Sequence, residues 1–303
     1  MDILLQRYRR TQMNAVFDPL EESAPIARRL APELCRNDPD TGRSCAPSHG
    51  LWQYLRLLGL ALSPEHHREL FQRALDGVAA PAEPVRVLVS GAADYAMLAH
   101  VLAAFGRRGV KVAATVLDLC ETPLALNRWY AERVAQPLET HCGDILEYSP
   151  RERFDVVCTH AFFAMIPARQ RPALLGKWHA LLRPGGIAVT VNRVRPDNSA
   201  AQVSFGEDEV LAFREAVRAR ARAFGPALGI DPDALALDAE HYARRQHFHP
   251  VRSAEEIGAL FEQAGFALDH LSVAPIAQGK QAGIAGPTVP GTADYLRVIA
   301  KRR

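Results

Sequence analysis

The chain has 303 residues, of which 48% are hydrophobic and 23% are charged. This balance excludes a wholly disordered chain, and the length suits one large α/β domain or two small ones. Lys and Arg number 36 and Asp and Glu number 34, so the formal charge of +2 gives no general electrostatic attraction to nucleic acid or to an anionic membrane.

The apolar segments and the cysteines indicate the cellular compartment of the protein. No apolar run approaches the roughly 20 residues that span a bilayer, and the polar, Arg-rich first ten residues lack the apolar region of a secretory signal. We therefore expect a soluble, cytoplasmic protein. The cysteines are odd in number and thinly spread, which favours reduced thiols over a disulfide framework; they are Cys35, Cys45, Cys120, Cys142 and Cys158.

The first 80 residues predict helices. Apolar residues at helical spacing indicate helices over 26–34 and 51–62, and a Ser-Pro-Glu start indicates a third from 63 to about 75. Dense turn residues at 37–42 separate the first two, and the Pro-rich segment 81–84 reads as a linker. We expect a helical N-terminal cap over residues 1–80.

From Val85 onward, short apolar strands alternate with helices. Strands are predicted over 85–90, 110–117, 138–141, 154–159 and 187–192, with helices over 97–105, 122–134 and 169–182. Parallel strands need crossover connections, so this alternation predicts a parallel sheet with helices on both faces.

The alternation stops near Pro196. Helices over 207–224 and 233–246 form an expected insertion at about 196–250, and a helix over 253–264 follows. Strands over 266–273 and 295–300, joined by the Gly- and Pro-rich stretch 278–291, suggest an antiparallel pair at one sheet edge. The prediction is a second unit, residues 81–303, with a seven-stranded, mostly parallel sheet.

Three features of the α/β unit suggest a nucleotide site. Gly91 makes a sharp turn after the strand Val87 to Ser90, where it lets a ligand approach the backbone. Asp118 ends the second strand, where a carboxylate can accept both hydroxyls of a ribose. Asp144 follows the third strand in Cys-Gly-Asp-Ile, and its carboxylate suits an amino group.

These motifs, together with Phe154 to His160 and the Arg-Pro-Gly-Gly turn at 183–186, make the chain resemble the class I S-adenosylmethionine-dependent methyltransferases, with their Rossmann-like sheet, over about 84–194 and 251–301. The family's first turn is usually G-x-G-x-G, and here Ala93 and Tyr95 replace two glycines. The resemblance implies S-adenosylmethionine as cofactor and these cofactor-binding residues: Gly91, Ala92, Ala93, Asp94, Tyr95, Asp118, Leu119, Gly143, Asp144, Ile145 and His160.

A nicotinamide-dependent dehydrogenase is the competing interpretation, because it also uses a glycine turn and a ribose carboxylate. The incomplete glycine fingerprint, the position of the Arg-Pro-Gly-Gly turn and the closing strand pair all count against it.

Methyl transfer from a sulfonium needs alignment and sometimes a base, so a visible catalytic triad is not required. The expected catalytic residues are His160, whose titration range suits a base near neutral pH, and Tyr242, which would position an acceptor. His160 alternatively bonds only to the cofactor or caps its strand.

The acceptor site is expected to be walled by the N-terminal cap and the insertion. The proposed acceptor-binding residues are His49, Trp52, Tyr54 and Arg245. Cys35, Cys45 and His49 can be read as three metal ligands, but their spacing is not a recognised zinc pattern, so we expect no bound metal.

We therefore expect an S-adenosylmethionine-dependent methyltransferase acting on a small-molecule acceptor, without nucleic-acid or membrane partners. The sequence leaves the acceptor and the oligomeric state undetermined, and a homodimer stays open. Two alternatives remain: another use of the cofactor, such as aminocarboxypropyl transfer or internal cyclisation, and a non-catalytic cofactor-binding protein.

Overall fold

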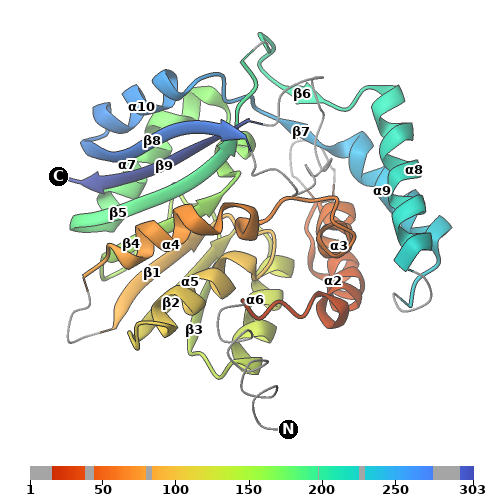
Figure 1. Cartoon of the computed structure of the whole chain (residues 1–303), viewed down its shortest axis with the longest axis horizontal. Helices are drawn as coiled ribbons and strands as arrows, with labels where there is room; N and C mark the ends of the chain where they lie inside the picture. Colours follow the sequence, from red (N-terminus) through yellow and green to blue (C-terminus); the bar gives the residue numbers. More distant parts are fainter. Residues whose placement is uncertain (1–15, 38–43, 80–83, 197, 225–228, 276–293) are drawn as a thin grey trace, which may run out of the picture.

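The computed structural model describes residues 16–37, 44–79, 84–196, 198–224, 229–275 and 294–303 (Figure 1). The Arg-rich first ten residues, most of the turn at 37–42, most of the linker at 81–84 and the Gly- and Pro-rich stretch 278–291 lie outside them. None of the helices in the described ranges combines the length and apolar character that a membrane span requires.

The described strands form a seven-stranded sheet in the order β3-β2-β1-β4-β5-β9-β8. β1 (Val85–Ser90), β2 (Val112–Asp118), β3 (Leu138–Cys142), β4 (Phe154–His160) and β5 (Leu182–Arg193) pair in parallel. β9 (Asp294–Arg302) runs antiparallel between β5 and the edge strand β8 (Phe266–Pro275). The predicted mostly parallel sheet and its antiparallel closing pair are confirmed.

β5 is longer than predicted. The sequence indicates a turn at 183–186 before a strand from 187, whereas the structure has one strand from Leu182, with a register shift where it meets Phe154 and Val156 of β4. Gly185 takes a positive φ of 79°, which a residue without Cβ tolerates. The Pro-Gly-Gly segment is thus an irregularity inside the strand, because β4 still pairs on both sides of it.

Helices cover both faces of the sheet (Figure 1). One core gathers α5 (Ala96–Gly106) and α6 (Glu121–Arg133) with inward residues of β1 and β2, and the other gathers α7 (Arg171–Leu181) and α10 (Ala254–Gln263). α10 begins as the sequence predicts, since the Ser253 hydroxyl accepts the Glu256 N–H at 3.1 Å.

The N-terminal helices belong to two different cores. They are α2 (Leu20–Leu34), α3 (Ala46–Leu57), the 3₁₀ helix η1 (Pro64–His67) and α4 (Arg68–Asp76). Leu70, Phe71 and Leu75 of α4 are buried in the same core as β1, so this helix is an integral layer of the α/β unit. The division of the chain at residue 80 stays a prediction.

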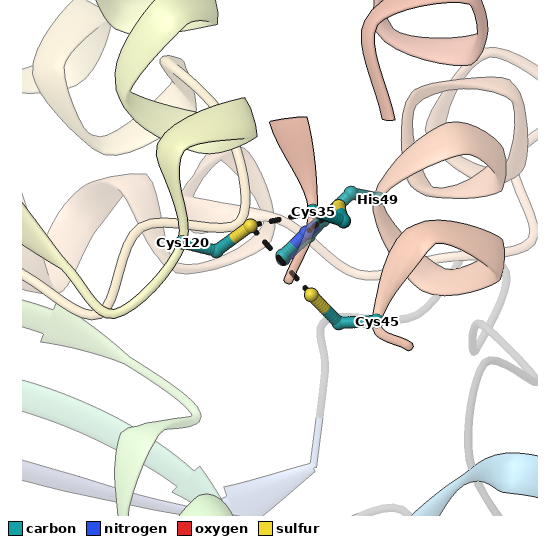
Figure 2. Close-up of side chains that lie close together, drawn as sticks. All are labelled: Cys35, Cys45, His49 and Cys120. Carbon is teal, nitrogen blue, oxygen red and sulfur yellow. Dashed lines mark hydrogen bonds between the residues drawn. The ribbon is translucent and has the colours of Figure 1, made fainter. Parts of the chain in front are cut away.

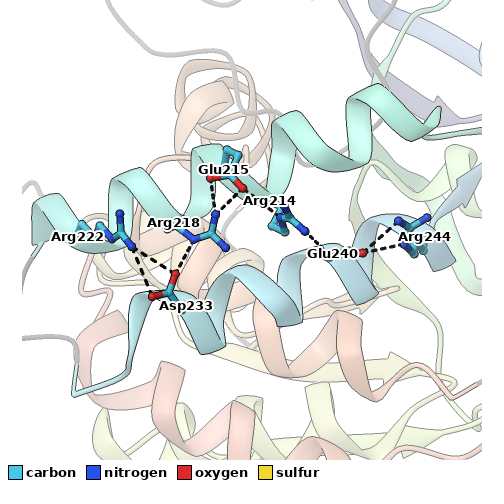
Figure 3. A network of polar contacts seen from close by, with 7 residues as sticks. All are labelled: Arg214, Glu215, Arg218, Arg222, Asp233, Glu240 and Arg244. Carbon is cyan, nitrogen blue, oxygen red and sulfur yellow. Dashed lines mark hydrogen bonds and ion pairs between the residues drawn. The ribbon is translucent and has the colours of Figure 1, made fainter.

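The predicted insertion is a pair of helices, α8 (Glu207–Phe224) and α9 (Pro232–Arg245). Their apolar faces pack with α3 in a third core. Exposed ion pairs join their outer faces, among them Arg214–Glu240 at 2.9 Å and Arg218–Asp233 at 2.6 Å (Figure 3). The many arginines of α8 are therefore explained by a solvated network. Two short strands, β6 (Val203–Ser204) and β7 (His247–Phe248), flank the pair.

Candidate functional site

The ends of β1, β2 and β3 meet at the carboxyl edge of the sheet. Gly91 donates its N–H to the Leu117 carbonyl at 2.9 Å, and Gly143 donates to the Asp118 carbonyl at 3.0 Å. The Asp118 carboxylate accepts the N–H of Cys120 at 2.8 Å and that of Ala92. Three segments predicted to share one ligand therefore lie in direct contact, with the carboxylate at their centre.

Gly91 is a position that no other residue fits. Its φ is +69°, and a Cβ placed there would come within 2.5 Å of Cε2 of Phe162. The contact depends on Ala161, which follows β4 with a φ of +59°, a value that alanine rarely adopts. The backbone is strained where β4 ends, and this strain sets the Phe162 ring against the glycine turn.

Asp118 is a largely buried carboxyl. Burial raises its pKa to about 6, and the nearby His49 imidazole opposes that rise. The next side chain, Leu119, is 70% exposed, which is uncommon for a leucine beside a buried carboxylate. An apolar surface next to a hydrogen-bond acceptor suits a nucleoside, whose base is planar and whose sugar donates hydroxyls.

The Cys-Gly-Asp-Ile segment forms a short turn at the same edge. Asp144 accepts the Leu146 N–H at 2.8 Å through Oδ1, and Ile145 is buried beneath it. This bond fixes the direction of the Asp144 side chain, which stays partly exposed.

Asp94 and Tyr95, expected to bind cofactor, instead contact the N-terminal helices. Asp94 pairs with Arg56 of α3 at 2.6 Å, and both side chains are at least 96% buried. The Tyr95 hydroxyl lies 2.9 Å from the Ser23 hydroxyl of α2. Its ring stacks on Tyr130 of α6 at a centroid distance of 4.6 Å. Asp94 and Tyr95 thus join the α/β unit to its N-terminal helices. Ala93 is exposed.

His160 lies at the end of β4, half-buried, with its ring 5.5 Å from that of His67. Burial lowers the pKa of His160 to about 3, and His66 and Arg56 add to the effect. Its Nε2 is enclosed and has no hydrogen-bond partner among the described residues. The ring is therefore neutral near pH 7 and is a weak proton acceptor, so the structure favours a hydrogen-bonding role over that of a general base.

The two candidate tyrosines lie inside the third core. Tyr242 is buried beside Phe213 of α8, and Tyr54 is buried in the same cluster. Burial raises the pKa of both hydroxyls. The structure explains these rings by packing between α3, α8 and α9.

The other acceptor candidates lie around the start of α3. Trp52 is partly buried against the third core, and exposed Arg245 reaches the Ser44 carbonyl at 3.5 Å. His49 is grouped with Cys35, Cys45 and Cys120 (Figure 2).

Sequence reasoning missed Arg56 and Cys120. Arg56 lies in an apolar helix stretch where it had no visible partner. Cys120 follows Asp118 by two residues, and its place at the carboxyl edge of the sheet could have identified it as a site residue.

Part of the chain is similar to known methyltransferases. Residues 96–186, from the start of α5 to the Gly-Gly of β5, match the model of a family described as a methyltransferase domain. The ubiquinone biosynthesis O-methyltransferase of Rhodopseudomonas palustris (strain HaA2) is 31% identical over 109 residues, which are 36% of this chain and 42% of that protein. The corresponding enzyme of Bradyrhizobium sp. (strain ORS 278) is also 31% identical over 109 residues. The chain thus spans less than half the length of the curated relatives it matches.

Solved structures with a similar chain path include two methyltransferases. N-methyltransferase NodS from Bradyrhizobium japonicum WM9, in complex with S-adenosyl-L-homocysteine, is 14% identical with a TM-score of 0.47, covering 83% of this chain and 98% of that one. The apo form of the S-adenosylmethionine-dependent methyltransferase SibL is 17% identical with a TM-score of 0.49, covering 94% of this chain and 70% of that one.

Proposed function

We propose that this chain carries a methyltransferase domain of the class I, S-adenosylmethionine-dependent family, and that it transfers the methyl group of S-adenosylmethionine to a small-molecule acceptor. The observation that carries the proposal is the convergence of the Gly91 turn, the Asp118 carboxylate and the Gly143 turn at one edge of the sheet.

The residues at this edge fit the cofactor. The backbone of the Gly91 turn would border the methionine part, and Asp118 would accept the ribose hydroxyls. Leu119 offers exposed apolar surface for adenine, and the Asp144 carboxylate would accept its amino group. The enclosed, unpaired Nε2 of His160 is a further polar atom that a ligand would satisfy.

The cofactor supplies an electrophilic methyl group, and the protein's part is to hold the two reactants in line. His160 stays neutral near pH 7, so it can direct a hydrogen bond at the carboxyl end of β4 without adding charge beside a sulfonium. The Phe162 ring, which follows the strained Ala161, packs against Gly91 and limits the space at that turn.

We propose a small-molecule acceptor for two reasons. The formal charge of +2 provides no electrostatic surplus for a polynucleotide. Asp94 and Tyr95 hold the N-terminal helices against the α/β unit and are therefore not available to an acceptor. Trp52 and Arg245, around α3, remain as the candidate acceptor contacts.

The experiment is a product assay with methyl-labelled S-adenosylmethionine and a set of small phenolic, amine and carboxylate acceptors. We expect S-adenosylhomocysteine to form in equal amount with a labelled product for at least one acceptor class. Methylthioadenosine as the product would instead indicate aminocarboxypropyl transfer or cyclisation. Tight S-adenosylhomocysteine binding without turnover on any acceptor would indicate a non-catalytic binding protein.

A further inference from the structure

Four side chains, three from the N-terminal helices and one from the start of α6, meet beside the carboxyl edge. They are Cys35, Cys45, His49 and Cys120, called the thiol cluster below. One ligand atom from each, three sulfurs and a ring nitrogen, lies within 4.8 Å of all the others (Figure 2). Three of the residues are half-buried and Cys120 is buried.

Three distances within the thiol cluster are close to those between ligands of one tetrahedral ion. Cys120 Sγ lies 3.5 Å from Cys35 Sγ and 3.6 Å from Cys45 Sγ, and His49 Nδ1 lies 3.2 Å from Cys35 Sγ. Metal–ligand distances of about 2.3 Å for sulfur and about 2.0 Å for nitrogen place tetrahedral ligands roughly 3.5–3.8 Å apart. A disulfide needs a sulfur–sulfur distance of about 2.05 Å and would leave the third sulfur unpaired.

The local structure presents the ligands before any ion arrives. Cys45 is the N-cap of α3, and His49 follows one turn later, its N–H donated to the Cys45 carbonyl at 3.1 Å. Residues four apart share one face of a helix. Cys120 is the N-cap of α6, and Cys35 ends α2. A helix N-terminus favours the thiolate form that a metal binds.

Neighbouring groups complete the arrangement. The Thr122 hydroxyl lies 3.1 Å from Cys35 Sγ, so it can donate to a thiolate there. The Asp118 carboxylate interacts electrostatically with His49, and a carboxylate behind a ligand histidine is a common outer contact of metal sites.

We propose that Cys35, Cys45, His49 and Cys120 bind one Zn²⁺ ion, which fastens α2 and α3 to the start of α6. Three thiolates and an imidazole form a closed four-ligand set of the kind that structural zinc sites use. The sequence predicts no bound metal, because the spacing of Cys35, Cys45 and His49 is not a recognised zinc pattern. The fold changes that expectation by adding a fourth ligand, Cys120, from the edge of the sheet, 71 residues beyond His49.

The ion would also hold in place the backbone next to Asp118, the residue proposed to bind the ribose. Cys120 is two residues from Asp118, and its N–H is bonded to that carboxylate. Fixing Cys120 fixes the backbone that orients Asp118, so the zinc site supports the edge without contacting the reacting groups.

The test is the zinc content of the full chain, purified under reducing conditions without chelator and measured by elemental analysis and native mass spectrometry. We expect one zinc ion per chain. Cys45→Ser should lose the ion on dialysis against a chelator concentration that the native chain withstands. Cys142→Ser, a change at an exposed cysteine outside the thiol cluster, should keep it.

Two further measurements separate ligation from packing. His49→Cys keeps four ligands and should retain zinc, whereas His49→Ala should not. Metal-stripped native chain titrated with Co²⁺ should develop the visible absorption of tetrahedral cobalt–thiolate coordination, saturating at one equivalent. A folded native chain that contains no zinc and takes up neither Zn²⁺ nor Co²⁺, or equal zinc content in the native chain and Cys45→Ser, would overturn the proposal.

Discussion

Replacing Gly91 by alanine should destabilise the protein through two separable effects. The first is conformational: a φ of +69° places alanine in the left-handed region, at a cost of roughly 1–2 kcal/mol. The second is steric. The new Cβ would lie 2.5 Å from Cε2 of Phe162, more than an ångström inside the optimum of about 3.5–4.0 Å.

The steric effect should add about 1–3 kcal/mol, because overpacking forces the ring and its neighbours to move. Phe162 also stacks on Trp178 at 6.4 Å, which restricts the direction in which the ring can move. The free energy of unfolding should therefore fall by about 2–5 kcal/mol in Gly91→Ala.

A double-mutant cycle with Phe162→Leu separates the two effects. Urea unfolding, followed by circular dichroism, should show that Gly91→Ala costs much less when residue 162 is leucine, with only the conformational part remaining. Equal costs in the two backgrounds would refute the contact between the turn and the ring as the reason for glycine at position 91.

Two other side chains give independent predictions. Arg56→Met should lower the free energy of unfolding by about 3–5 kcal/mol because it leaves Asp94 charged and buried. Arg244→Met, at an exposed ion pair, should lower it far less, and chemical denaturation of both variants compares them. Burial, helped by Arg68 and Arg56, lowers the pKa of His100 from 6.5 to about 3. Between these two pH values the unfolded chain binds a proton at His100 that the folded chain does not bind, so the free energy of unfolding falls as the pH drops from 6.5 towards 3. The loss reaches at most about 2 kcal/mol at about pH 5, and His100→Gln should show a correspondingly weaker decline in urea midpoint between neutral pH and that value.

The strands were predictable because each is a short apolar run bounded by turn residues, and parallel pairing follows from the helices between them. The closing antiparallel pair was predictable for a similar reason, since the Gly- and Pro-rich sequence 278–291 predicts no helix between the two strands. β5 begins earlier than predicted because its pairing with β4 continues past the Pro-Gly-Gly segment, which local turn signals cannot reveal.

The residues around the site were harder to predict because their partners are distant in the sequence. Tyr95 replaces a glycine of the turn, and only the packing of α2 shows why a large ring belongs there. Cys35, Cys45 and His49 lack a fourth ligand in their own segment, and tertiary structure supplies Cys120. Phe162 meets Gly91 only because Ala161 adopts a left-handed conformation that no propensity favours.

The central claim is that Asp118 faces a ribose, and titration calorimetry with S-adenosylhomocysteine tests it most directly. Asp118→Asn keeps an acceptor for the Cys120 N–H but loses the charge, so affinity should fall about tenfold or more, in line with roughly 1.5–3 kcal/mol for a hydrogen bond to a charged group. The matched change Asp155→Asn, in β4 where that carboxylate bonds Arg86 and Arg183, should leave affinity unchanged. Equal affinities for the native chain and Asp118→Asn, or no binding to the native chain, would contradict the claim.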